Sequence, residues 1–156
     1  MKKLIALLMA LAMVACLFGC KPNDDNSGST GSYPEYFNGM EDLIKEAQAE
    51  GELVVYGSCE EEYLAAACKN FQEIFGIKVE YQRLSTGEVL SKVEEENGNP
   101  SADVWFGGTT DPYNVAAAEN LLEKYEAKNA SHITKPQYKH SDGMWYGIYT
   151  GILGFM

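Results

Sequence analysis

Three short segments of the sequence combine glycine with small hydroxyl side chains, as sites that hold a polar ligand often do. They are residues 57–59 (GSC), 85–88 (STGE) and 107–111 (GGTTD). Each follows an apolar run and precedes a run with helical periodicity. Glycine lets a ligand approach the backbone closely, and the first N–H groups of a helix have no partner within it. If the fold brings them together, the segments suit an anionic or strongly polar ligand.

Taken singly, each segment is also an ordinary turn between a strand and a helix, because glycine is common in such turns. All three segments stand in the same position relative to their strands, and this shared position is what indicates a binding site. The residues that we expect to contact a ligand are Ser58, Thr86, Gly87, Gly108 and Thr109, with Trp145 and Tyr149 nearby.

Charged residues near these segments leave two interpretations open. Glu60 to Glu62 directly follow the first segment and either complement a helix dipole or, through Glu60, favour an amine or a metal in the cleft. Arg83 is the only arginine and ends the second apolar run. It either meets a carboxylate or phosphate of the ligand or makes an ion pair on the surface.

Aromatic residues are the other candidates for a binding pocket. They are Trp105, Phe106, Tyr113, Trp145, Tyr146 and Tyr149. Aromatic side chains on strands are more often part of a core. Trp145 and Tyr149 stand apart because glycines surround them.

Catalytic and metal-binding patterns are not found in the sequence. The only histidines, His132 and His140, lie outside the three segments, and no nucleophile is paired with a base. There is no dinucleotide or Walker fingerprint. We therefore expect no enzyme activity, no cofactor and no metal centre.

Two cysteines, Cys59 and Cys68, remain once Cys16 and Cys20 are assigned to targeting. Nine residues of helix rise about 13 Å, which is beyond the reach of a disulfide if both lie in one helix. We expect Cys68 in the core and Cys59 in a loop.

The elements that must position these residues alternate between strands and helices. The expected strands are residues 53–56, 77–84 and 102–106, and the expected helices are 40–50, 60–75, 89–97 and 111–119. Ser85 and Glu88 form a predicted capping box, and Asp111 with Pro112 predicts the start of the last helix. This order implies an α/β fold, mainly a parallel sheet flanked by helices, with ligands at the carboxyl ends of the strands.

The C-terminal part of the sequence has a different pattern. Residues 144–149 and 152–156 have β character, and the sequence ends inside an apolar run. We interpret this as a truncated chain.

The first 20 residues are typical of a lipoprotein signal peptide. Lys2 and Lys3 precede an apolar stretch at 4–18, and residues 17–20 (LFGC) resemble a lipobox with Cys20 as the lipidated residue. Residues 13–16 are a weaker second candidate. The following residues, 21–36, are expected to be a flexible tether. The net charge of −11 disfavours nucleic acid as a partner.

The chain resembles the iron/phosphonate-type family of extracellular solute-binding proteins of ABC importers. The similarity runs in order through residues 53–58 (LVVYGS), 75–79 (FGIKV), 85–90 (STGEVL), 99–105 (NPSADVW), 121–125 (LLEKY) and 142–149 (DGMWYGIY). It implies a type II periplasmic-binding-protein fold with two lobes that close on the ligand. Residues 37–156 would form the N-terminal lobe and the start of the crossover to a missing second lobe.

The resemblance also implies a function. A lipid-anchored protein on the extracellular face of the bacterial cell membrane would capture a small-molecule ligand and deliver it to ABC permease subunits. The alternative is a tethered receptor that signals to a sensor partner. The ligand is left open between a ferric complex, a phosphonate, a phosphosugar, thiamine and a polyamine. Ferric-iron members carry a histidine and a glutamate where Glu60 and Gly108 stand here.

Overall fold

The computed structural model describes residues 37–96 and 98–151. They belong to a compact unit, Tyr33–Met156. The expected signal peptide, Cys20, the tether and the apolar residues 152–156 all lie outside the described residues.

The described residues form a parallel sheet of three strands in the order β2-β1-β3. The strands are β1 (Glu52–Gly57), β2 (Lys78–Arg83) and β3 (Val104–Phe106). Gly57 at the end of β1 pairs with Arg83 on one side and with Phe106 on the other. The three carboxyl ends therefore lie level at one edge of the sheet, as the sequence predicts.

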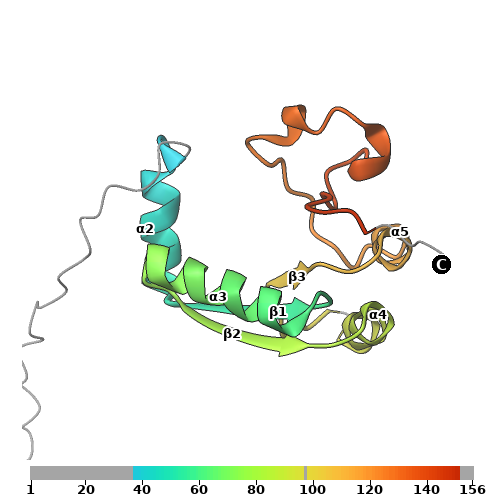
Figure 1. Ribbon diagram of the computed structural model, residues 1–156, viewed down its shortest axis with the longest axis horizontal. Coiled ribbons are helices and arrows are strands. Elements are labelled where there is room, and N and C mark those ends of the chain that lie inside the picture. The colour runs from blue at the N-terminus through green and yellow to red at the C-terminus, as the bar shows by residue number, and fades with distance from the viewer. Residues whose placement is uncertain (1–36, 97, 152–156) are drawn as a thin grey trace, which may run out of the picture. The chain divides into compact units, whose positions relative to one another are not determined.

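Helices follow each strand and precede the first one (Figure 1). They are α2 (Glu41–Glu50), α3 (Glu61–Phe75), α4 (Thr86–Glu95) and α5 (Thr110–Ala118), with 3₁₀ turns at Ala130–His132 and Pro136–Tyr138. This confirms the α/β class. None of the helices in the described part is long and apolar enough to cross a membrane.

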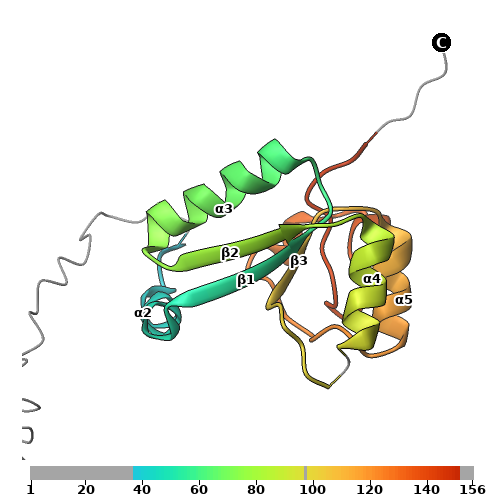
Figure 2. The ribbon, with the colours of Figure 1, turned by 90° about the horizontal axis from the view of Figure 1, so that it is seen from below.

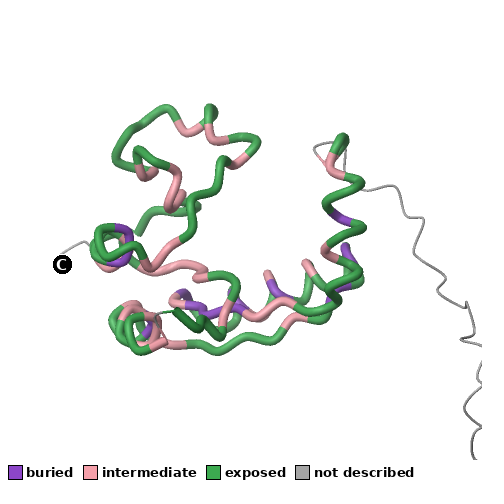
Figure 3. Tube along the Cα trace, turned by 180° about the vertical axis from the view of Figure 1, so that it is seen from behind, coloured by how far each residue is buried: buried purple, intermediate pink, exposed green. Residues whose placement is uncertain are grey.

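The core lies mainly between the sheet and α3, which runs along one face of it (Figure 2). Leu64 and Cys68 of α3 pack with Val55 of the central strand, and all three are buried. Helices α4 and α5 lie side by side, each with buried residues (Figure 3). Burial of apolar area fixes α3 on the sheet and holds α4 and α5 against each other.

A second cluster joins α2 to the far end of α3 and the start of β2. Ile44, Phe75 and Ile77 form it, and all are buried. Gly51 and Gly76 end the two helices with φ of 81° and 70°, the left-handed conformation that glycine adopts without strain. The helix ends predicted from these glycines are confirmed.

Helix α5 begins earlier than the sequence predicts. Its N-cap is Thr109 rather than Asp111, so Pro112 is the third helical residue and not the first. The reason is the turn before it: Gly107 and Gly108 have φ of 81° and 99°, and the helix starts immediately afterwards. Asp111 still lies in the first turn, where a carboxylate complements the helix dipole.

Residues 144–149 do not form the predicted strand. Their one ladder contact is an isolated antiparallel bridge between Tyr146 and Lys139. The backbone bonds around that bridge join Gly147 N–H to Tyr138 O at 2.8 Å and His140 N–H to Trp145 O at 3.0 Å. Alternating side chains favour a strand only where a neighbouring strand pairs along its length, and none does here within the described residues.

Cys59 lies in the loop after β1, as expected, but the prediction missed that it is buried. It belongs to the same core cluster as Cys68, and both thiols are free. Burial raises the pKa of both cysteines, so the neutral thiol is favoured.

Candidate functional site at the carboxyl edge of the sheet

The three glycine-containing segments meet at the carboxyl edge of the sheet. A Cβ atom built on Gly108 would lie 2.6 Å from Thr86 Oγ1 and 2.9 Å from Ser58 Cβ. Residues 50 positions apart in the sequence are thereby in contact, because parallel strands with helical crossovers place every strand-to-helix loop at one edge.

This packing gives a different reason for glycine at position 108 from the one predicted. Its φ of 99° and the atoms of Thr86 and Ser58 leave no room for a side chain. Gly108 is therefore required for contact between the loops, whether or not a ligand approaches it. Gly87 differs, since no heavy atom lies within 4 Å of the position of its Cβ.

Ser58 is held by the first and third strands together. Its N–H donates to Phe106 O at 2.8 Å, and its Oγ accepts from the indole N–H of Trp105 at 3.1 Å. The serine hydroxyl keeps its own proton. Ser58 is thus oriented by Trp105 and retains one hydrogen to donate to a ligand.

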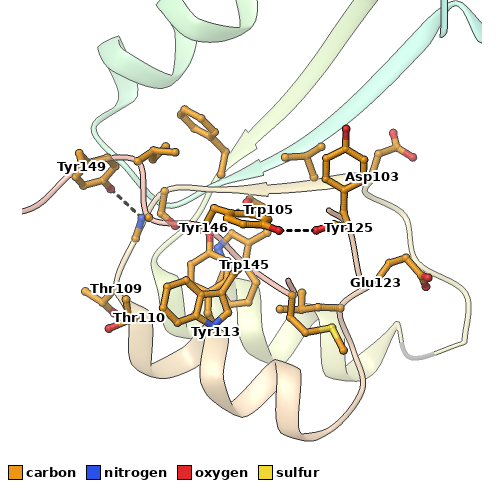
Figure 4. A pocket seen from close by; sticks show the side chains of 18 residues that line it. Asp103, Trp105, Thr109, Thr110, Tyr113, Glu123, Tyr125, Trp145, Tyr146 and Tyr149 are labelled. Atoms are coloured by element: carbon orange, nitrogen blue, oxygen red, sulfur yellow. Dashed lines mark hydrogen bonds between the residues drawn. The ribbon is translucent and has the colours of Figure 1, made fainter. Parts of the chain in front are cut away.

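Tyr149 reaches the third segment from a distant part of the chain. Gly108 N–H donates to the phenol oxygen of Tyr149 at 2.8 Å (Figure 4). The Tyr149 ring meets the Tyr63 ring edge-on, with ring centroids 6.3 Å apart. Tyr63 in turn stacks on Phe106, with ring centroids 6.0 Å apart. Tyr63 was not among the predicted site residues. The sequence does place Tyr63 in the first turn of the helix that follows the first segment, and that position could have identified it.

A cavity of about 450 Å³ lies between β3, the start of α5 and residues 144–149. Four predicted site residues line it: Gly108, Thr109, Trp145 and Tyr149. Ser58, Thr86 and Gly87 do not line it. They lie at the loop edge beside it, so the structure divides the predicted set between the loop edge and the cavity.

Aromatic side chains make up much of the cavity wall. Trp105 stacks on Tyr113 with ring centroids 4.1 Å apart, and the Trp145 indole N–H donates to Asn114 Oδ1 at 3.1 Å. Tyr113 donates its hydroxyl to Gly107 O at 2.7 Å. Burial, with smaller contributions from Tyr149 and Cys59, raises the pKa of Tyr113, so its hydroxyl stays protonated and braces the turn.

Tyr146 fixes the other end of the same wall. Its hydroxyl donates to Tyr125 O at 2.7 Å and accepts from Ala127 N–H at 3.3 Å. These bonds attach residues 144–149 to the segment that follows α5. Six aromatic residues predicted as pocket candidates therefore all line the cavity: Trp105, Phe106, Tyr113, Trp145, Tyr146 and Tyr149.

Arg83 supports the first segment. Its Nε donates to Cys59 O at 3.2 Å, which links the end of β2 to the loop after β1. Glu60 is the N-cap of α3, and its side chain makes no capping hydrogen bond. Within the described residues, no group of three or more His, Cys, Asp or Glu side chains lies close enough to hold a metal ion.

Comparison with known proteins places this geometry in context. No model of a known protein family matches the chain. An uncharacterized protein of Haemophilus influenzae is 41% identical over 118 residues, which is 70% of this chain and 32% of that protein.

Solved structures of binding proteins share the fold, among them the following two. The periplasmic binding protein AfuA of Actinobacillus pleuropneumoniae, with fructose-6-phosphate bound, is 37% identical with a TM-score of 0.54, over 57% of this chain and 28% of that one. Iron-bound HitA of Pseudomonas aeruginosa is 28% identical with a TM-score of 0.58, over 62% of this chain and 31% of that one. The described residues thus have the fold of a periplasmic-binding-protein lobe, and the chain spans about a third of the length of these relatives.

Proposed function

We propose that this chain provides one wall of the ligand site of a solute-binding protein that serves an ABC importer. The observation that carries the proposal is the meeting of Ser58, Thr86 and Gly108 at the carboxyl edge of the sheet. In open α/β sheets this edge is where ligands bind. The similarity to periplasmic binding proteins supports a solute-binding role.

The chemistry of the edge favours a ligand with a charged oxygen. Helices α3, α4 and α5 all begin there, and the first N–H groups and positive dipole end of a helix favour an anion. Hydroxyl groups of Ser58 and Thr86 add donors. Fructose-6-phosphate in AfuA and iron in HitA are what similar proteins hold. We infer a phosphate-bearing small molecule for this chain.

The setting of the protein is part of the proposal. Lipid attachment at Cys20 would hold it on the extracellular face of the cell membrane, where it would pass its ligand to permease subunits. The signal-peptide pattern and the relatives' description as periplasmic support this location.

Native purification of the complete gene product, followed by mass spectrometry of bound small molecules, tests the proposal. Calorimetric titrations with fructose 6-phosphate, inorganic phosphate and ferric citrate then rank the ligand classes. We expect the sugar phosphate to bind. The proposal is wrong if no small molecule copurifies and none of the three probes binds.

A matched pair of variants connects binding to the loop edge. Thr86→Val keeps the shape of the side chain and removes its hydroxyl, while exposed Thr134→Val makes the same change in the segment between the 3₁₀ turns. The net value of a hydrogen bond is about 0.5–1.5 kcal/mol, so Thr86→Val should weaken binding about two- to tenfold. Thr134→Val should leave it unchanged.

A further inference from the structure

The N–H group of Gly108 is already occupied in this structure. Its hydrogen bond to the phenol oxygen of Tyr149 is 2.8 Å long. A backbone N–H has a single hydrogen, so a ligand oxygen can bind it only after the phenol oxygen leaves. One backbone donor of the third segment is therefore held by the protein's own side chain.

The packing around Gly108 closes one side of the residue. Thr86 Oγ1 and Ser58 Cβ lie 2.6 and 2.9 Å from the position of its Cβ, which closes that side of the residue to a ligand. The side facing Tyr149 borders the cavity (Figure 4). A ligand in the cavity reaches this N–H through the space that the Tyr149 hydroxyl fills.

Tyr149 is attached in a way that allows it to move. The residue is 46% exposed, and it lies in a stretch, 147–151, that has no regular secondary structure. The ring has a neighbour in Tyr63, at 6.3 Å and edge-on. An exposed hydrogen bond between neutral groups contributes little, whereas one to a charged oxygen is roughly twice as strong. A phosphate oxygen can therefore replace the phenol.

We propose that Tyr149 is a latch on the binding site: without ligand its hydroxyl occupies Gly108 N–H, and a ligand oxyanion displaces it. This inference rests on the proposed function, since it assigns a regulatory residue to the same site. Ligand affinity is then set partly by the cost of releasing Tyr149, because the competent state is only part of the free population.

Tyr149→Phe tests the latch by removing the acceptor and keeping the ring. In calorimetric titration of the complete gene product with fructose 6-phosphate, the variant should bind two- to tenfold more tightly than the wild type. Tyr81→Phe is the control. It removes the hydroxyl of an exposed tyrosine on β2, outside the site, and among the described residues that hydroxyl makes no hydrogen bond. The control should bind as the wild type does.

A second measurement follows the contact itself without ligand. With ¹⁵N-glycine labelling, Tyr149→Phe should shift the amide resonance of Gly108, and fructose 6-phosphate added to the wild type should shift the same resonance. If the variant leaves this resonance in place, the contact is absent in solution and the latch is disproved.

The outcomes separate the latch from the function on which it rests. Weaker binding by Tyr149→Phe would mean that the phenol touches the ligand, which overturns the latch and leaves the proposed function standing. If neither the wild type nor the variant binds fructose 6-phosphate or inorganic phosphate, the phosphate-binding function fails and the latch fails with it.

Discussion

At the scale of single residues, Gly57 shows how closely the central strand is packed against α3. A Cβ atom at this position would lie 2.2 Å from Leu64 Cδ2, and Leu64 is fully buried. Gly57→Ala therefore forces Leu64 or the strand to shift. We expect the free energy of unfolding to fall by about 1–3 kcal/mol, measured by urea denaturation.

Gly87 supplies the matched control for this substitution. It lies in the first turn of α4, has no heavy atom within 4 Å of its Cβ position, and does not require a positive φ. Alanine costs less backbone entropy in a helix, so Gly87→Ala should leave stability unchanged or raise it by up to about 1 kcal/mol. Equal losses in both variants would show that Leu64 is not the cause.

Cys20 carries a separate prediction from the sequence, since it lies outside the described residues. We expect it to receive the lipid, because residues 17–20 resemble a lipobox. Expression with a labelled fatty acid in a bacterium that processes lipoproteins should label the wild type and Cys16→Ser, but not Cys20→Ser. Label retained on Cys20→Ser would rule out this assignment.

At the scale of elements, helix α4 depends on its capping box. Ser85 Oγ accepts from Glu88 N–H at 3.3 Å, and Glu88 Oε2 accepts from Ser85 N–H at 2.7 Å. Loss of a serine N-cap costs about 1 kcal/mol. Ser85→Ala should therefore lower the free energy of unfolding by that amount in urea denaturation, while Ser141→Ala, in an exposed turn, should not.

The same capping box predicts a dependence on pH. Hydrogen bonds from the Ser85 side chain and backbone lower the pKa of Glu88 in the folded protein. A lowered folded pKa contributes stability above the unfolded value, about 4.3, and this contribution is lost as the pH falls through the folded pKa. The stability difference between wild type and Glu88→Gln should shrink as urea denaturation is moved from pH 7 into that acid range. A difference that does not change with pH would contradict the capping role.

The sequence predicts most elements because their signals are local. Apolar periodicity, the Ser85 capping box and the glycines at 51 and 76 all act within a few residues. The start of α5 and residues 144–149 were predicted wrongly. There, the outcome depends on two glycines with positive φ and on whether a neighbouring strand is available. A local sequence pattern does not show whether a neighbouring strand is available.

The candidate site divides in the same way. Topology alone predicts that the three segments meet, since parallel strands put their loops at one edge. The contact of Gly108 with Thr86, its bond to Tyr149 and the part played by Tyr63 are long-range side-chain details. The spacing of residues in the sequence does not predict such contacts. The predicted site residues stay predictions until binding is measured.

At the scale of the whole molecule, the proposed function gives the described lobe only one wall of a ligand site. The loop edge and Tyr149 are partly exposed, and the chain spans about a third of its relatives' length. A ligand on this wall would keep much of its surface in water, where each hydrogen bond contributes only about 0.5–1.5 kcal/mol net. A second wall would exclude that water and add donors of its own.

We therefore expect the 156-residue chain to bind fructose 6-phosphate at least a hundredfold more weakly than AfuA does, a difference of about 2.8 kcal/mol. AfuA provides the comparison, because it can be titrated whole and as the segment that matches this chain. The segment should lose affinity as this chain does, while the folded state of both is checked by circular dichroism. If the isolated segment and the whole relative bind equally, one lobe is sufficient and the two-wall site is wrong.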